Sequence, residues 1–168
     1  MDLKEHIRSI QDYPKKGILF RDITTLIKNE KAFKECIDQI VQRTKKFEFD
    51  KIAAIESRGF VFASAVSYIL KKPFILLRKK NKLPAEVHSI DFELEYGTAT
   101  MEVHKDAIEQ DDSVLLIDDL GSELDLENLE FALSEISKVP NQVVLTGIQG
   151  EELEKLVSNF SNFKKINL

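Results

Sequence analysis

The amino-acid sequence predicts an α/β protein built on one mainly parallel, twisted sheet flanked by helices. Short apolar runs of strand length, such as residues 52–55 and 114–117, alternate along the chain with longer segments of helical periodicity. Alternating strands and helices imply βαβ units and parallel pairing. The 168 residues, 43% of them apolar and 32% charged, suffice for one core, so we expect a single domain over residues 1–168.

The first third of the chain mixes helical and turn patterns. The spacing of its apolar residues predicts a short amphipathic helix over residues 1–10, and the turn signals of residues 12–17 predict a loop that continues to residue 22. Asn29 can cap the following helix, whose apolar residues recur at helical spacing as far as about Lys45.

The middle of the chain supplies strands that end in polar segments. Residues 52–55 predict a buried parallel strand, and residues 60–70 predict a helix that is apolar on nearly all sides and ends before Pro73. Residues 74–77 predict the next strand. The strict alternation of residues 91–103 around Gly97 predicts a two-stranded ribbon.

The C-terminal part continues the same alternation. The expected elements are a buried strand at 114–117, a helix at 126–136 ended by Pro140, a strand at 143–145, a short helix at 151–157 and an edge strand at 165–168. No repeat or long linker divides the chain.

Three polar segments follow predicted strands: residues 56–59, residues 78–82, and the chain from Asp118 onward. Ligands of parallel sheets bind beyond the carboxyl ends of the strands, so these segments predict one site. Asp118 and Asp119 could accept hydrogen bonds from a ribose diol, or they could simply cap the next helix.

The other candidate residues also have two interpretations each. Ser57, Arg58 and Gly59 could bind an anion or form a plain turn. The basic run 78–82 could contact pyrophosphate or be a solvated surface. The pair Phe20-Arg21 could hold a flat base or be core packing beside a surface charge, and Glu95-Tyr96 could be a mobile acid-bearing flap or an ordinary hairpin tip.

Composition narrows the function classes. The formal net charge of −5 makes nucleic-acid binding unlikely as a general function. Cys36 is the single cysteine, so no intrachain disulfide forms, and we expect it to pack in a core. The three histidines and Cys36 show no metal-ligand spacing. Residues 1–10 resemble neither a signal peptide nor a membrane span, so we expect a cytoplasmic protein.

Taken in order, four segments resemble those of the adenine phosphoribosyltransferases, a family with the type I phosphoribosyltransferase fold. Residues 13–24 look like its base-binding segment, residues 55–60 like its pyrophosphate loop, residues 78–84 like its basic loop, and residues 94–98 like its flexible two-stranded flap. The resemblance runs from about residue 1 to Leu120. Several motifs in register are more specific than any one of them.

The resemblance implies purine salvage, in which adenine and phosphoribosyl pyrophosphate give AMP and pyrophosphate, with Mg²⁺ bound through the pyrophosphate and ribose hydroxyls of the substrate and no metal ligand from the protein. It also implies a homodimer. The implied substrate-binding residues are Leu19, Phe20 and Arg21 for the purine, Ser57, Gly59, Arg78, Lys79 and Lys82 for pyrophosphate, and Asp118, Asp119, Gly121 and Ser122 for the ribose and its phosphate. The implied catalytic residues are Arg58, at the pyrophosphate, and Glu95, which would assist proton transfer, while Tyr96 would help to close the site.

The segment after Asp119 departs from the family pattern of glycines and threonines. Residues 118–130 contain six acids, at positions 118, 119, 123, 125, 127 and 130, and no Lys or Arg. At about 5 Å and an effective dielectric of about 20, each carboxylate and phosphate pair costs on the order of 3 kcal/mol. The sequence therefore predicts weak or lost turnover. Ser122 with Asp125 resembles a capping box, which would direct that acid to the helix's own N–H groups.

Two other functions stay open at this point. A non-catalytic purine or nucleotide sensor on the same fold would keep Phe20, Arg21 and Arg58 and tolerate the altered loop. A nucleic-acid partner for residues 78–82 would give binding that collapses with added salt.

Overall fold

The structure is a computed structural model that describes residues 1–94, 97–117, 143–147 and 164–167. The chain divides into two compact units, Met1–Thr44 and Lys45–Leu168. The expectation of one domain over residues 1–168 stays a prediction.

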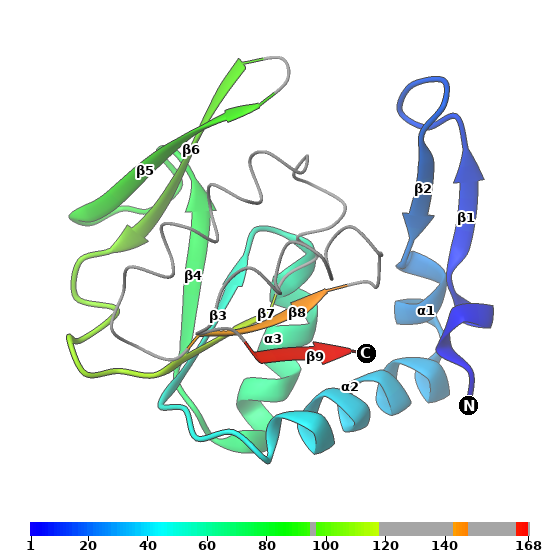
Figure 1. The fold of residues 1–168 in the computed structure, drawn as a ribbon, viewed down its shortest axis with the longest axis horizontal. Helices are drawn as coiled ribbons and strands as arrows, with labels where there is room; N and C mark the ends of the chain where they lie inside the picture. The colour runs from blue at the N-terminus through cyan, green and yellow to red at the C-terminus, as the bar shows by residue number, and fades with distance from the viewer. Residues whose placement is uncertain (95–96, 118–142, 148–163, 168) are drawn as a thin grey trace. The chain divides into compact units, whose positions relative to one another are not determined.

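The first unit contains a two-stranded antiparallel ribbon and two α-helices (Figure 1). Its elements are η1 (Leu3–His6), β1 (Arg8–Gln11), β2 (Leu19–Asp22), α1 (Thr24–Lys28) and α2 (Glu30–Thr44). Ile10 on β1 lies opposite Phe20 on β2. The expected helix over residues 1–10 is therefore limited to the short 3-10 helix η1, and the expected loop holds for the turn at residues 12–17 but not for residues 19–22, which form β2. The pairing joins residues from 8 (Gln11 with Leu19) to 14 (Arg8 with Asp22) positions apart, and helical spacing within one short segment carries no information about such a partner.

The helix expected after Asn29 is confirmed as α2. The Asn29 side-chain oxygen accepts a hydrogen bond from the Ala32 amide at 3.0 Å, which satisfies one of the unpaired N–H groups of the first turn. The buried face of α2 includes Cys36, as expected, and burial raises the pKa of the Cys36 thiol to about 11. A thiol with such a pKa stays protonated and packs as a small apolar group.

The second unit is built on a sheet of seven described strands (Figure 1). The strands are β3 (Lys51–Ile55), β4 (Phe74–Lys79), β5 (Val87–Leu94), β6 (Gly97–His104), β7 (Val114–Ile117), β8 (Val143–Gly147) and β9 (Lys164–Asn167). Their order is β5-β6-β4-β3-β7-β8-β9, with parallel pairing from β4 through β9 and antiparallel pairing of β4 with β6 and of β6 with β5. The predicted mainly parallel sheet, with its edge strand near residues 165–168, is confirmed.

The core of this unit lies where α3 (Arg58–Leu70) packs against β3, β4 and β7. The central strands are almost fully buried, with Ile52 and Leu115 both at 0% exposure. The expected apolar helix against the sheet is thus confirmed, although its outer side is exposed, including Tyr68 at 86%. The helix ends at Leu70 because Lys71 adopts the left-handed conformation, two residues before Pro73.

The ribbon expected at residues 91–103 is longer and belongs to the main sheet. Strands β5 and β6 pair from Val87 and His104 to Leu94 and Gly97, and β6 continues the sheet beyond β4. The basic run also differs from expectation, because β4 includes Arg78 and Lys79. The helices expected at 126–136 and 151–157 lie outside the described residues.

Candidate active site

The carboxyl ends of three parallel strands lie at one edge of the sheet. Ile55, the last residue of β3, is opposite Leu77 on β4, and Ala54 is opposite Ile117, the last residue of β7. The chain therefore leaves β3 at Glu56 beside the point where β4 reaches Arg78. This edge brings together two of the three polar segments expected there, and the third continues from Ile117 into residues outside the described ranges.

The segment Ser57-Arg58-Gly59 links β3 to α3. The peptide bond between Glu56 and Ser57 is cis. Ser57 is exposed and its side chain makes no capping hydrogen bond to α3, while Arg58 is half-buried as the first residue of that helix. The hydroxyl of Ser57 and the guanidinium of Arg58 thus lie at a helix N-terminus, a place that favours anions.

Gly59 has a packing role that the sequence did not indicate. A Cβ atom at this position would lie 2.6 Å from the Ile117 carbonyl oxygen and 3.1 Å from the Ala54 Cβ. Only a residue without a side chain lets the first turn of α3 approach β3 and β7 this closely. The requirement for glycine is thus explained by the sheet contact itself.

The expected pyrophosphate residue Arg78 is bound to Glu56. Its Nε donates to Glu56 Oε2 and its Nη2 donates to Glu56 Oε1, both at 3.1 Å, and the Lys79 amide donates to the same carboxylate at 3.3 Å. The hydrogen bonds from Arg78, together with that from Lys79 and the charge of Lys82, lower the pKa of Glu56. Glu56 is therefore a carboxylate at neutral pH. The ammonium-bearing residues Lys79 and Lys82 are exposed.

The expected purine residues lie on β2, in the first unit. Leu19 is 47% exposed, and Phe20 is half-buried with its ring edge-on to Tyr13 at a centroid distance of 5.0 Å. Arg21 lies opposite Ser9 on β1, and its Nη1 donates to the Ser9 hydroxyl. An exposed aliphatic side chain, an aromatic ring and a guanidinium in sequence can contact a planar base.

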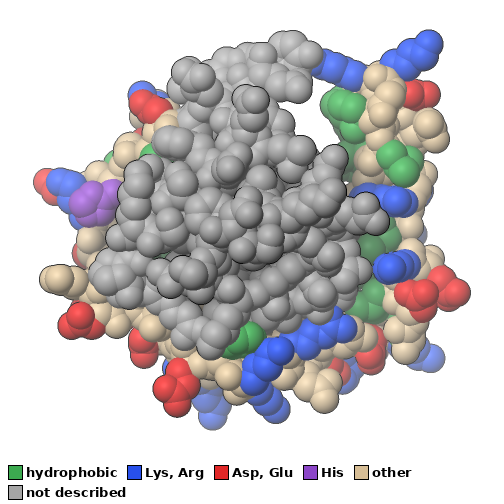
Figure 2. All heavy atoms as spheres, in the orientation of Figure 1, with side chains coloured by type: hydrophobic (Ala, Val, Ile, Leu, Met, Phe, Trp, Pro, Cys, Tyr) green, Lys and Arg blue, Asp and Glu red, His purple; other side chains and the backbone are tan. Residues whose placement is uncertain are grey.

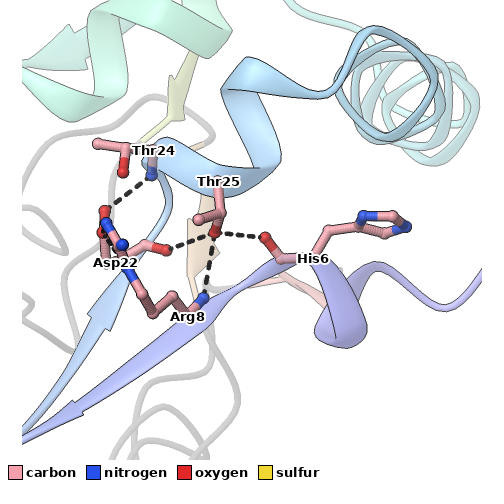
Figure 3. A network of polar contacts seen from close by, with 5 residues as sticks. All are labelled: His6, Arg8, Asp22, Thr24 and Thr25. Carbon is pink, nitrogen blue, oxygen red and sulfur yellow. Dashed lines mark hydrogen bonds and ion pairs between the residues drawn. The ribbon is translucent and has the colours of Figure 1, made fainter.

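A polar network fastens β2 to its neighbours (Figure 3). Arg8 on β1 donates to Asp22 Oδ2 through Nε at 2.9 Å and also through Nη2, and the Thr24 amide donates to Asp22 Oδ1 at 2.9 Å. The Thr25 hydroxyl donates to the His6 carbonyl oxygen at 2.7 Å. Hydrogen bonds from Thr24 and Arg8 lower the pKa of Asp22 to about 2. The network fixes the end of β2, one residue after Arg21.

The remaining expected residues lie outside the described ranges, and their roles stay predictions. They are Glu95, Tyr96, Asp118, Asp119, Gly121 and Ser122.

Sequence reasoning assigned no role to Glu56 or Glu102, which both contact the basic run. Glu102, on β6, is 6% exposed and accepts a hydrogen bond from the Asn81 amide at 2.9 Å. The sequence could have indicated Glu56, because this residue directly follows a predicted strand and the neighbouring parallel strand leads into the basic run 78–82. The sequence could not have indicated Glu102, since its position opposite Arg78 depends on the register between β4 and β6.

On the face drawn in Figure 2, described Lys and Arg side chains stand beside Asp and Glu side chains. Within the described ranges, none of the helices combines the length and the apolar character of a membrane span. The same residues include no group of three or more His, Cys, Asp or Glu side chains arranged for a metal ion.

A family model matches the chain over the edge just described. The model is that of the phosphoribosyl transferase domain, and it matches residues 22–122. The matched range includes Glu56, the start of α3, Arg78 and Glu102.

Curated relatives and solved structures extend this similarity. The chain is 78% identical over 120 residues to an adenine phosphoribosyltransferase of Pelagibacter ubique, covering 71% of this chain and 69% of the relative. It is 42% identical over 156 residues, 90% of each chain, to one from Agathobacter rectalis. The crystal structure of adenine phosphoribosyltransferase from Thermoanaerobacter pseudethanolicus superposes with a TM-score of 0.82 at 34% identity, covering 99% of this chain and 96% of that one. A Saccharomyces cerevisiae enzyme of the same name, complexed with an imino-altritol bisphosphate and adenine, gives 0.82 at 26% identity with the same coverage.

Proposed function

Because the chain belongs to the phosphoribosyltransferase domain family, we propose that it is a purine-salvage enzyme that transfers phosphoribose from phosphoribosyl pyrophosphate to adenine. The products are AMP and pyrophosphate. Two observations together support this proposal. Relatives named adenine phosphoribosyltransferase match the chain. An arginine, a helix N-terminus and exposed lysines lie at one edge of the sheet, where they can bind the pyrophosphate.

The leaving group must be stabilised during the reaction. A ring nitrogen of adenine forms a bond to the ribose carbon that carries the pyrophosphate, and the electron pair of the breaking C–O bond leaves with the pyrophosphate. Negative charge grows on the leaving group, so cations and N–H groups held in place beforehand lower the barrier. Arg58, Ser57, Lys79 and Lys82 would supply these groups, and Arg78 would contribute its charge.

The base and the ribose require different partners. Leu19, Phe20 and Arg21 would hold the adenine, and the nitrogen's proton would pass to Glu95 while Tyr96 helps to exclude water. Asp118 and Asp119 would accept hydrogen bonds from the ribose hydroxyls, and the amide of Gly121 with the hydroxyl of Ser122 would bind the 5′-phosphate.

The residues at this edge fit a metal that arrives with its substrate. Both oxygens of Glu56 accept hydrogen bonds from Arg78, so this carboxylate serves the arginine and not a metal ion. Mg²⁺ bound to the pyrophosphate and ribose oxygens of the substrate would neutralise charge on the leaving group. We further propose a cytoplasmic homodimer, the compartment being supported by a single cysteine that is buried and unpaired.

Ligand-dependent melting tests the proposed function against a non-catalytic purine or nucleotide sensor, which the acids at positions 123, 125, 127 and 130 favour. A ligand that binds the folded state raises the melting temperature, and at a fixed concentration a tighter ligand raises it more. We expect stabilisation by phosphoribosyl pyrophosphate with Mg²⁺ and by AMP. Stabilisation by adenine alone, with no response to the other two, would support the sensor instead.

A further inference from the structure

We propose that Glu56 and Glu102 are positioning residues that hold the basic segment, residues 78–82, in the geometry that binds pyrophosphate. The inference rests on the proposed function and adds two carboxylates to a site that must bind a polyanion. Acids at such a site need a physical explanation, because each one repels the ligand unless its charge is matched.

The negative charge of Glu56 is balanced by the positive charge of Arg78. The two side chains form a forked pair, with Arg78 Nε and Nη2 each 3.1 Å from a separate Glu56 oxygen. The side chains are only 29% and 20% exposed, so water screens the pair less than it would at the surface. The third nitrogen, Nη1, donates to the Lys82 carbonyl oxygen at 3.0 Å. One carboxylate thus fixes the arginine, and the arginine in turn fixes the far end of the segment.

Glu102 holds the middle of the same segment. It lies on β6 opposite Arg78, and its Oε2 accepts from the Asn81 amide at 2.9 Å. Asn81 has a φ of 64°, a left-handed conformation that asparagine tolerates better than most residues. The Lys80 amide donates to the Thr100 carbonyl oxygen at 3.2 Å. Strand β6 therefore holds the turn at its tightest residue, Asn81, and at the residue before it.

The two anchors leave cationic groups available to a ligand. A guanidinium has five N–H groups, and the three bonds that the described residues make with Arg78 leave two for a phosphate oxygen. Lys79, Lys80 and Lys82 are exposed. Because the backbone between them is already ordered, binding does not need to order it, which removes part of the entropic cost of association.

The test is the replacement Glu56→Gln, which keeps the shape of the side chain and removes its charge. We expect the KM for phosphoribosyl pyrophosphate to rise about tenfold, as for loss of one charge-assisted contact. The KM for adenine should change little, and the melting temperature should fall only modestly, through loss of the charge that Arg78 stabilises. The matched control is Glu86→Gln, which removes the same charge from an exposed pair with Lys105 and should leave every constant unchanged.

A double substitution shows whether Glu56 acts through Arg78. Added to Arg78→Met, the Glu56→Gln change should raise the KM for phosphoribosyl pyrophosphate no further, whereas independent roles would multiply. For Glu102, Glu102→Gln retains an acceptor and should preserve the KM, while Glu102→Ala should raise it. A direct readout is the Arg78 Nε–H signal in NMR spectra, which should be protected from exchange in the parent chain and lose that protection in Glu56→Gln.

An unchanged KM for phosphoribosyl pyrophosphate in Glu56→Gln, in a parent chain that forms AMP, overturns this inference and leaves the proposed function intact. A parent chain that neither forms AMP nor binds phosphoribosyl pyrophosphate overturns both. Equal rises in the KM for both substrates, with a strongly lowered melting temperature, would show that Glu56 serves the fold generally and would also overturn the positioning role.

Discussion

Asp22 is a single carboxylate that joins three elements of the first unit. It accepts hydrogen bonds from Arg8 on β1 and from the Thr24 amide at the start of α1, and it is itself the last residue of β2. With 7% of its surface exposed, it has little access to water in place of these partners. The neighbouring Arg21 and Phe20, which we propose to contact adenine, depend on the strand that Asp22 ends.

The first prediction concerns Asp22→Asn. The folded-state pKa of Asp22, about 2, lies below its ordinary value of 3.8, so its charge stabilises the folded protein. This contribution is complete above about pH 5 and is lost as the pH falls through the folded-state value. We expect the variant to melt at a lower temperature at pH 7, and the difference from the parent chain to shrink as the pH approaches 2.

The control is Asp38→Asn, which removes a carboxylate from an exposed pair with Lys34 on α2. Its melting temperature should stay near that of the parent chain at every pH, because water screens an exposed pair. A constant difference between Asp22→Asn and the parent chain from pH 7 to pH 2 would contradict the assigned role of the Asp22 charge.

The sequence predicts which side chains lie at the sheet edge, but it does not predict which of them bind one another. Arg78 and Glu56 both lie within segments expected at the sheet edge, yet no pattern in the chain indicates that the arginine binds the carboxylate. Such a pairing depends on the strand register, which places Ile55 opposite Leu77. Register is set by the whole sheet.

At the scale of elements, the close approach of α3 to β7 decides the position of the candidate anion site. The helix begins at Arg58, and its second residue, Gly59, is buried against the last carbonyl group of β7. This contact holds the helix N-terminus at the carboxyl edge of the sheet. A side chain at residue 59 would force the two elements apart.

The second prediction is that Gly59→Ala destabilises the protein by on the order of 1–3 kcal/mol, as overpacking of a core does. The added methyl group would meet the Ile117 oxygen at 2.6 Å, which belongs to backbone and cannot rotate away. Denaturant unfolding measures the change. Ser64→Ala, at an exposed position of the same helix, should alter the free energy of unfolding by less than about 0.5 kcal/mol. Equal stability of the two variants would refute the assigned contact.

Helices and strands could be predicted where the residues of one segment alone, such as an apolar run or a helix cap, indicate the structure. Buried strands such as 52–55 and 114–117 and the capped helix α2 were expected at nearly their observed bounds. The β1 and β2 ribbon could not be found in this way, because each strand has only four residues and gains its stability from the other. The exposed side of α3, with Tyr68, was also missed, since an apolar composition does not tell which side faces the sheet.

At the scale of the whole molecule, family membership and the local sequence disagree over one segment. The family model matches residues 22–122, and the described core and sheet edge agree with a phosphoribosyltransferase. The acids of residues 123–130, beyond that match, would repel a phosphate bound near Gly121 and Ser122. The chain is therefore predicted to be an enzyme of reduced rate, through a loop that lies outside the described residues.

The third prediction is that the triple replacement Glu123→Thr, Leu124→Gly and Asp125→Gly raises kcat/KM for phosphoribosyl pyrophosphate. It removes two negative charges and supplies flexible backbone N–H groups for the 5′-phosphate. The control, Glu127→Gln with Glu130→Gln, removes the same charge without new glycines and should raise the rate less. If the parent chain already matches the repaired chain, the loop does not limit the reaction.

Formation of AMP by the purified parent chain, from adenine and phosphoribosyl pyrophosphate with Mg²⁺, is the reaction that defines the proposed enzyme. We predict that AMP and pyrophosphate form in equal amounts, at a rate below that of the loop-repaired chain but well above that of an Arg58→Ala variant. Absence of AMP from both the parent and the repaired chain, with adenine still bound, would contradict the assignment of this protein as a phosphoribosyltransferase.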